Sequence, residues 1–128
     1  MIAVPPPAIL EVYYAPSCAP CQPELPVLVE FLRQDGAKLR IVIVSEDRKA
    51  RETLRAASLS LVQAARSPRS ADARATLREA GDADGILPYA RSLSPSGRVC
   101  AQWRGGITLA KARDLVQACA RIISPVRR

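Results

Sequence analysis

Residues 9–44, which read ILEVYYAPSCAPCQPELPVLVEFLRQDGAKLRIVIV, decide the fold. Ile9–Tyr14 is a short apolar run rich in strand-forming residues, and residues 22–34 carry leucine and valine at helical spacing. Asp35-Gly36 ends this predicted helix, and residues 39–44 form a run that is aliphatic except for Arg40. Such a run is typical of a strand that is buried on both faces of a parallel sheet. The stretch therefore predicts a strand-helix-strand unit.

The rest of the chain predicts further helices and a β-hairpin. The helices are expected at residues 48–57, 70–80 and 109–123, the last of them capped by Thr108. Two strands are expected at residues 89–93 and 98–104, on either side of the turn sequence Ser94-Pro95-Ser96-Gly97, and residues 58–69 are left unassigned. The predicted order is β-α-β-α-α-β-β-α, which indicates an α/β fold.

Length and composition predict one compact domain. The chain has 128 residues, of which 48% are hydrophobic and 24% charged, so it can bury a core without disulfide support. We expect a single domain over residues 1–128, with residues 1–8 as a loose N-terminal segment and residues 124–128 as a tail.

The net charge of +7 raises the question of a nucleic-acid partner. The excess lies in residues 85–128, which hold eight basic side chains and one acidic one, Asp114. These bases are spread singly, and the aromatic residues do not alternate with them as base-stacking platforms would. A solvated basic face is therefore the interpretation we adopt, and no nucleic-acid partner is expected.

The sequence predicts no membrane span, because no apolar run approaches the roughly 18 residues that a span needs. Residues 1–10 are apolar but lack a charged start and are interrupted by Pro5, Pro6 and Pro7, unlike a signal peptide. As written, the chain is expected in the cytoplasm. A missing leader would instead make it extracytoplasmic.

Histidine is absent, which excludes Ser-His-Asp and Cys-His catalysis and histidine metal clusters. The four cysteines are the reactive groups that remain. Cys18-Ala19-Pro20-Cys21 lies where the first predicted strand runs into the first helix. A thiol at a helix N-terminus has a lowered pKa, because the helix dipole and unpaired N–H groups favour its thiolate. Cys18 is thus the candidate nucleophile, and Cys21, one turn later, can attack a mixed disulfide formed at Cys18.

Two other interpretations of the four cysteines stay open. A structural zinc site would need Cys100 and Cys119 as additional ligands. An idle CxxC in a binding module is the second alternative. We interpret Cys100 and Cys119 as packing residues: Cys119 lies on the apolar face of the last helix, and strand alternation puts Cys100 on the face of Gln102 and Arg104. A bridge between them would need Cα atoms within about 7 Å, which the sequence does not show.

The sequence around the CxxC motif resembles the thioredoxin superfamily. Residues 13–28, YYAPSCAPCQPELPVL, are similar to the CxxCxxExPxL pattern of the TlpA-like and ResA-like branch, with Pro26 at the position of its helix-kink proline. Residues 85–89, GILPY, resemble the segment with the superfamily's cis-proline, and residues 94–99 the hairpin after it; residues 46–80 match least. The resemblance implies a thioredoxin-like fold, with a central mixed β-sheet flanked by helices on both faces.

The resemblance also implies a substrate-binding segment. A cis bond at Leu87-Pro88 would present the backbone of Leu87 to a substrate peptide beside Cys18, with Tyr14 and Tyr89 as an apolar rim. Without the resemblance, Pro88 is a proline that opens a strand, and both tyrosines are equally well explained as packing residues.

Two departures from the family pattern affect the expected proton chemistry. Ser17 stands where the family usually has tryptophan, and Val12 stands where thioredoxins keep a buried aspartate that helps deprotonate the second cysteine. Glu24, three residues beyond Cys21, is our candidate substitute, since a half-buried carboxylate with a raised pKa can exchange a proton with that thiol. The alternative is a first-turn acid that the helix dipole stabilises.

Together these observations predict a thiol-disulfide oxidoreductase that acts through Cys18, Cys21 and Glu24 and uses Leu87, Pro88, Tyr14 and Tyr89 to hold its substrate. No cofactor other than the redox-active Cys18–Cys21 disulfide and no metal are expected. The expected partners of this monomer are protein thiols or disulfides and an upstream redox donor or acceptor. The alternative is a non-catalytic thioredoxin-fold binding module or a Cu(I)-handling protein that uses the same two thiols.

Overall fold

The computed structural model describes residues 8–36, 38–59, 63–66 and 73–123. The expectations for residues 1–7 and 124–128 lie outside these ranges. The described elements, in chain order, are β1 (Ile9–Tyr14), the short 3-10 helix η1 (Ala19–Cys21), α1 (Glu24–Asp35), β2 (Lys38–Ile43), α2 (Asp47–Ala56), β3 (Gln63–Arg66), α3 (Ala73–Ala80), β4 (Tyr89–Leu93), β5 (Val99–Arg104) and α4 (Leu109–Ile123).

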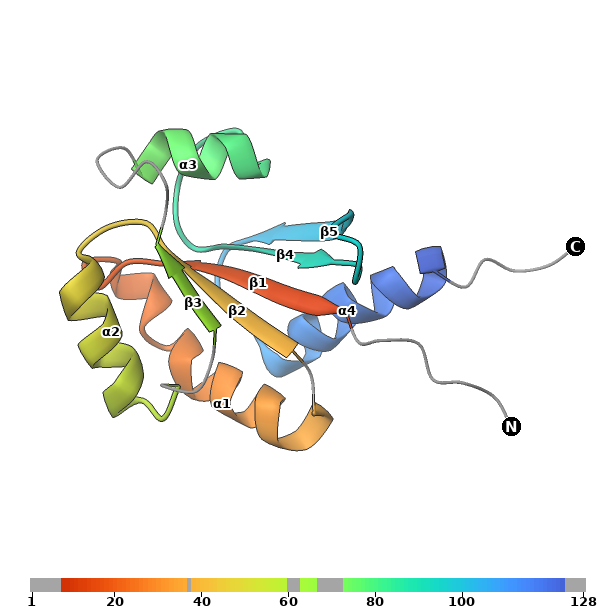
Figure 1. Ribbon diagram of the computed structural model, residues 1–128, viewed down its shortest axis with the longest axis horizontal. Helices are drawn as coiled ribbons and strands as arrows, with labels where there is room; N and C mark the ends of the chain where they lie inside the picture. Colours follow the sequence, from red (N-terminus) through yellow and green to blue (C-terminus); the bar gives the residue numbers. More distant parts are fainter. Residues whose placement is uncertain (1–7, 37, 60–62, 67–72, 124–128) are drawn as a thin grey trace, which may run out of the picture.

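The described strands form one mixed sheet in the order β3-β2-β1-β4-β5. β1 pairs in parallel with β2, and β2 with β3, whereas β4 is antiparallel to both β1 and β5. Figure 1 shows α1, α2 and α4 along one face of the sheet and α3 on the other. The expected mixed sheet with helices on both faces is therefore confirmed.

β3 corrects the predicted element order. The sequence left residues 58–69 unassigned, but Gln63–Arg66 extends the sheet by pairing with β2. The expected third helix begins at Ala73, and the first residues predicted for it, 70–72, lie outside the described part of the chain.

Each face of the sheet has its own buried cluster. On the face of α1, α2 and α4, side chains from β1 and β2 pack against helical residues such as Leu28, Leu54 and Leu115. The cluster on the other face, which includes residues of α3, is smaller. On this face the buried Glu11 carboxylate accepts a hydrogen bond from Arg91 Nε at 2.6 Å, which makes an ion pair. Alternation along β1 explains the division, because successive side chains of a strand point to opposite faces.

Within the described ranges, no helix combines the length and apolar character that crossing a bilayer requires.

Candidate active site

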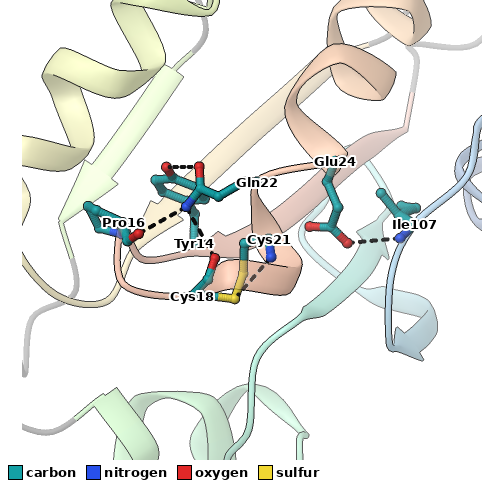
Figure 2. Close-up of a disulfide and its surroundings, with 7 residues drawn as sticks. All are labelled: Tyr14, Pro16, Cys18, Cys21, Gln22, Glu24 and Ile107. Carbon is teal, nitrogen blue, oxygen red and sulfur yellow. Dashed lines mark hydrogen bonds between the residues drawn. A yellow bond between two sulfur atoms is a disulfide. The ribbon is translucent and has the colours of Figure 1, made fainter.

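The CxxC sequence follows β1 directly, at the carboxyl end of the parallel strands. After Tyr14 the chain turns, and Cys18 N donates to the carbonyl oxygen of Ala15 at 3.0 Å. Cys18 then caps η1 with an extended backbone, and its Sγ accepts from the backbone N–H of Cys21 at 3.1 Å. Figure 2 shows this turn and the side chains around it.

Cys18 and Cys21 form a disulfide with a Cα–Cα distance of 5.3 Å. Cys18 is half-buried, whereas Cys21 is fully buried in the cluster under α1. The structure therefore places Cys18 as the accessible member of the pair and Cys21 behind it.

The helix begins later than the sequence predicted. It was expected from residue 22, but α1 starts at Glu24, so Cys18 caps a short 3-10 turn and not the long helix. Proline explains the delay, because Pro26 has no N–H to donate to the Gln22 carbonyl, which accepts from Leu25 N at 3.1 Å. A tighter 3-10 hydrogen bond thus takes the place of the first helical one.

Glu24 is buried at the start of α1, with 4% of its surface exposed. Burial is the larger influence on its carboxyl and raises the pKa from 4.5 to about 7. The hydrogen bond that Ile107 N donates to Oε2 at 2.8 Å lowers the pKa and offsets part of this rise. Figure 2 shows the carboxylate turned toward Ile107, whose side chain belongs to the same buried cluster as Cys21. Burial thus gives the Glu24 carboxyl a pKa in the neutral range, close to the CxxC motif.

The segment before β4 packs against the same two buried clusters as Cys18. The Leu87–Pro88 peptide bond is cis. Leu87 and Cys18 both pack against each of the two buried clusters, so the structure brings this segment and the CxxC motif together. Asp82, which is fully buried, fixes the segment by accepting from Ile86 N at 3.0 Å.

Tyr14 and Tyr89 do not form a substrate rim, contrary to the expectation from the sequence. Each has only 1% of its surface exposed. Tyr14 donates its hydroxyl to Gln22 Oε1 at 3.0 Å, and Tyr89 donates to the carbonyl oxygen of Ala80 at 2.9 Å. The packing alternative is the one that the structure supports, because both rings and both hydroxyls are used inside the protein.

Two residues of this site were not predicted from the sequence. Ile86, next to Leu87, is an exposed apolar side chain with 58% of its surface accessible, and it lines a surface pocket beside Pro88. Gln22 follows Cys21 and hydrogen-bonds around the turn that carries Cys18. The position of Ile86 directly before the Leu-Pro pair was a usable signal, whereas nothing in the sequence indicated the contacts of Gln22.

The connection from β5 to α4 contacts the site through its backbone. Gly105 N donates to the Pro88 carbonyl at 3.0 Å, and Ile107 N donates to Glu24. Trp103, at the end of β5, donates from its indole Nε1 to the carbonyl oxygen of Gly106 at 3.1 Å. The connection therefore links the cis-proline segment to the buried carboxylate.

Cys100 and Cys119 form a second disulfide, which corrects their interpretation as packing residues. The strand pairing matches Ser92 with Ala101 and Leu93 with Val99, so Cys100 is an extra residue in β5. Such a bulge interrupts the alternation that put Cys100 on the face of Gln102 and Arg104. Cys119 is fully buried on α4 as expected, and the bridge ties the edge strand to this helix.

Among the residues that the structure describes, no group of three or more Cys, Asp or Glu side chains is placed to hold a metal ion. The distant cysteines that a zinc site would require are joined to each other and not to the CxxC pair.

The fold of this chain is similar to that of solved proteins. The sequence matches no protein-family model and no curated protein. Among solved structures, a thioredoxin-related protein from Neisseria meningitidis serogroup B superposes with a TM-score of 0.72 at 17% identity, covering 92% of this chain and 88% of that one. The chain has a thioredoxin-like fold.

Two further solved structures support this thioredoxin-like assignment. A putative thiol:disulfide interchange protein DsbE from Chlorobium tepidum matches with a TM-score of 0.66 at 18% identity, covering 92% of this chain and 81% of that one. StoA from Bacillus subtilis matches with a TM-score of 0.63 at 18% identity, covering 88% and 81%.

Proposed function

We propose that this protein is a thiol-disulfide oxidoreductase of the TlpA-like and ResA-like type that exchanges disulfides in protein substrates. The observation that carries the proposal is the Cys18–Cys21 disulfide, with Cys18 accessible, between β1 and α1 of a thioredoxin-like fold. The similarity of its structure to the putative thiol:disulfide interchange protein DsbE from Chlorobium tepidum supports the proposal.

The reduced pair would transfer two electrons to a substrate disulfide. The Cys18 thiolate attacks one substrate sulfur, so that a mixed disulfide forms, the substrate S–S bond breaks and one substrate thiolate leaves. Cys21 then loses its proton and attacks Cys18 Sγ, which re-forms the Cys18–Cys21 bond and releases the second substrate thiolate. An external dithiol restores the reduced pair, and the same steps in reverse oxidise a substrate.

The neighbouring residues have separate roles in this proposal. Glu24 accepts the Cys21 proton, for which a carboxyl with a pKa of about 7 is suited near neutral pH. The backbone of Leu87 pairs with an extended substrate segment, and Pro88 shapes the chain there.

We place the protein outside the cytoplasm. The Cys100–Cys119 disulfide supports this, because structural disulfides persist in oxidising compartments and are rare where thiols are kept reduced. Fractionation of the source cells, with the redox state of Cys100 and Cys119 determined by thiol labelling, tests the placement. Finding both as free thiols in the cytoplasm would contradict it.

Insulin reduction by dithiothreitol tests the proposed activity. The wild-type protein should accelerate precipitation of the insulin chains, and Cys18→Ser should lose all acceleration, since the attacking sulfur is gone. Cys21→Ser should accumulate mixed disulfides, because nothing resolves them, and these are visible on non-reducing gels. Unchanged turnover in Cys18→Ser, or stoichiometric Cu(I) binding without exchange in the wild type, would refute the oxidoreductase assignment.

A further inference from the structure

The side chain of Gln22 folds back over the turn that carries Cys18 (Figure 2). Its Nε2 donates to the carbonyl oxygen of Pro16 at 3.0 Å and to that of Cys18 at 3.1 Å. Its Oε1 accepts from the hydroxyl of Tyr14, a residue that is buried in the core. The amide can lie only this way round, because carbonyl oxygens accept and do not donate.

The Cys18 carbonyl and the Cys18 sulfur share one donor. Cys21 N lies 3.1 Å from the carbonyl oxygen and 3.1 Å from Sγ, so a single N–H faces two acceptors. The demands of these acceptors differ with redox state, because a thiolate accepts a hydrogen bond far more strongly than a disulfide sulfur. In the reduced protein the N–H would serve the sulfur, and the carbonyl would need another donor to avoid an unpaired polar group.

Gln22 is that second donor. We propose that Gln22 is a positioning residue for Cys18, whose amide satisfies the Cys18 carbonyl and so leaves the Cys21 N–H available to the Cys18 thiolate. This inference rests on the proposed function, since it concerns the reactive state of the same cysteine. Tyr14 acts one step further away, by holding the amide in place.

Gln22 is not a reactant in the reduction of the Cys18–Cys21 disulfide. A dithiol reductant gives two electrons to the Cys18–Cys21 bond and is itself oxidised to a disulfide. The S–S bond breaks, Cys18 Sγ keeps the negative charge and Cys21 Sγ takes up a proton. Gln22 exchanges neither a proton nor an electron, and it stabilises the reduced product more than the oxidised one.

The test compares Gln22→Met, which is similar in length but has no donor, with the wild-type protein. The thiolate is titrated by its absorbance at 240 nm from pH 3 to 10, and the Cys18–Cys21 pair is equilibrated with glutathione buffers. We expect Gln22→Met to raise the pKa of Cys18. The equilibrium should shift about 3- to 10-fold toward the disulfide, the range that one net hydrogen bond implies.

Two further variants grade the effect. Gln22→Glu should shift both quantities further in the same direction, because a carboxylate would face two carbonyl oxygens and add negative charge beside the Cys18 thiolate. Tyr14→Phe keeps the ring and removes only the hydroxyl, so its shift should be smaller. Gln117→Met makes the same exchange as Gln22→Met at an exposed site on α4 and should match the wild type.

The outcomes separate this inference from the proposed function. If the wild-type protein does not accelerate insulin reduction, the proposed function fails. If the wild type behaves as proposed but Gln22→Met has the same thiol titration and glutathione equilibrium, with only its melting temperature lowered, Gln22 is merely structural and the inference is overturned. Should Gln22→Met not fold, an unshifted Tyr14→Phe overturns it instead.

Discussion

Cys18–Cys21 and Cys100–Cys119 each join a half-buried cysteine to a fully buried one, so burial does not distinguish the two disulfides. The neighbouring atoms do. Cys18 Sγ accepts a backbone N–H at 3.1 Å, whereas Cys100 Sγ lies 3.7 Å from the carbonyl oxygen of Arg98. After reduction, the N–H would favour a thiolate at Cys18, and the carbonyl oxygen would disfavour one at Cys100.

The two disulfides also differ in how much chain they enclose. Cys18 and Cys21 lie 3 positions apart in the sequence, and Cys100 and Cys119 lie 19 positions apart. A disulfide stabilises a fold chiefly by restricting the unfolded chain, and this effect grows with the length of the closed loop. The comparison therefore assigns chemistry to the short bridge and stability to the long one.

Removing the long bridge should have a large effect on stability. We expect Cys100→Ala combined with Cys119→Ala to lower the free energy of unfolding by about 3 kcal/mol, the value for a loop of this length. Insulin reduction at 25 °C should continue at a rate close to that of the wild type. Urea denaturation and the insulin assay measure the two quantities, and lost turnover in a folded double variant would break the division of roles.

Glu24 links the segments that carry the two disulfides. It comes three residues after Cys21, and its carboxylate accepts a hydrogen bond from the backbone N–H of Ile107, a residue in the loop that the Cys100–Cys119 disulfide closes. Burial raises its pKa from 4.5 to about 7, so between these values the folded protein binds more protons than the unfolded chain. Wild-type stability should therefore fall as the pH rises from about 4.5 to 7, and stay lower above pH 7.

Glu24→Gln removes the titrating charge and should abolish this pH dependence. At pH 8 we expect the variant to be more stable than the wild type by about 3 to 3.5 kcal/mol, because the pKa is raised from 4.5 to about 7 and each pKa unit corresponds to about 1.4 kcal/mol. At pH 4 the two should be equally stable. Urea denaturation at both pH values measures this, with Glu30→Gln as the control on the outer side of α1. Equal stability at pH 8 would show that burying the ionised Glu24 carboxylate does not destabilise the fold.

The smallest effect concerns the surface pocket beside Pro88. Ile86 lines the pocket next to Pro88 and is exposed, so Ile86→Ser should leave the fold stable. If substrate segments cover this side chain, its loss should raise KM for insulin by about 3- to 10-fold. Exchange with glutathione should not change. Equal effects on both substrates would show that Ile86 takes no part in binding polypeptides.

The sequence predicted the elements that form strong local patterns. β1, α1 and β2 followed from an apolar run, a helical repeat and a second apolar run. β3 was missed because its sequence, QAAR, has no β-branched or aromatic residue, and pairing with β2 is what makes it a strand. Tertiary contact decided this element, and no local signal reports it.

The candidate site was predictable where it depends on spacing and unpredictable where it depends on packing. Cys18 and Cys21 were found by their spacing, and Glu24 became a candidate through its match to the family pattern and its place three residues beyond Cys21. The burial that raises its pKa is seen only in the structure. The second disulfide was missed because a bulge places Cys100 out of alternation, which only the pairing of β4 with β5 shows. Tyr14 was misassigned because a ring beside the motif can point to the core as well as to a substrate.

The chain has a single tryptophan, Trp103, which is 37% exposed, with the Lys111 ammonium 4.2 Å from its ring centroid and its indole N–H bonded to Gly106. Its fluorescence therefore originates at one place, the connection whose backbone contacts both Pro88 and Glu24. Emission intensity and wavelength respond to a nearby cation and to solvent. A change in redox state or in the charge of Glu24 that moves this connection can thus be followed in real time without a label.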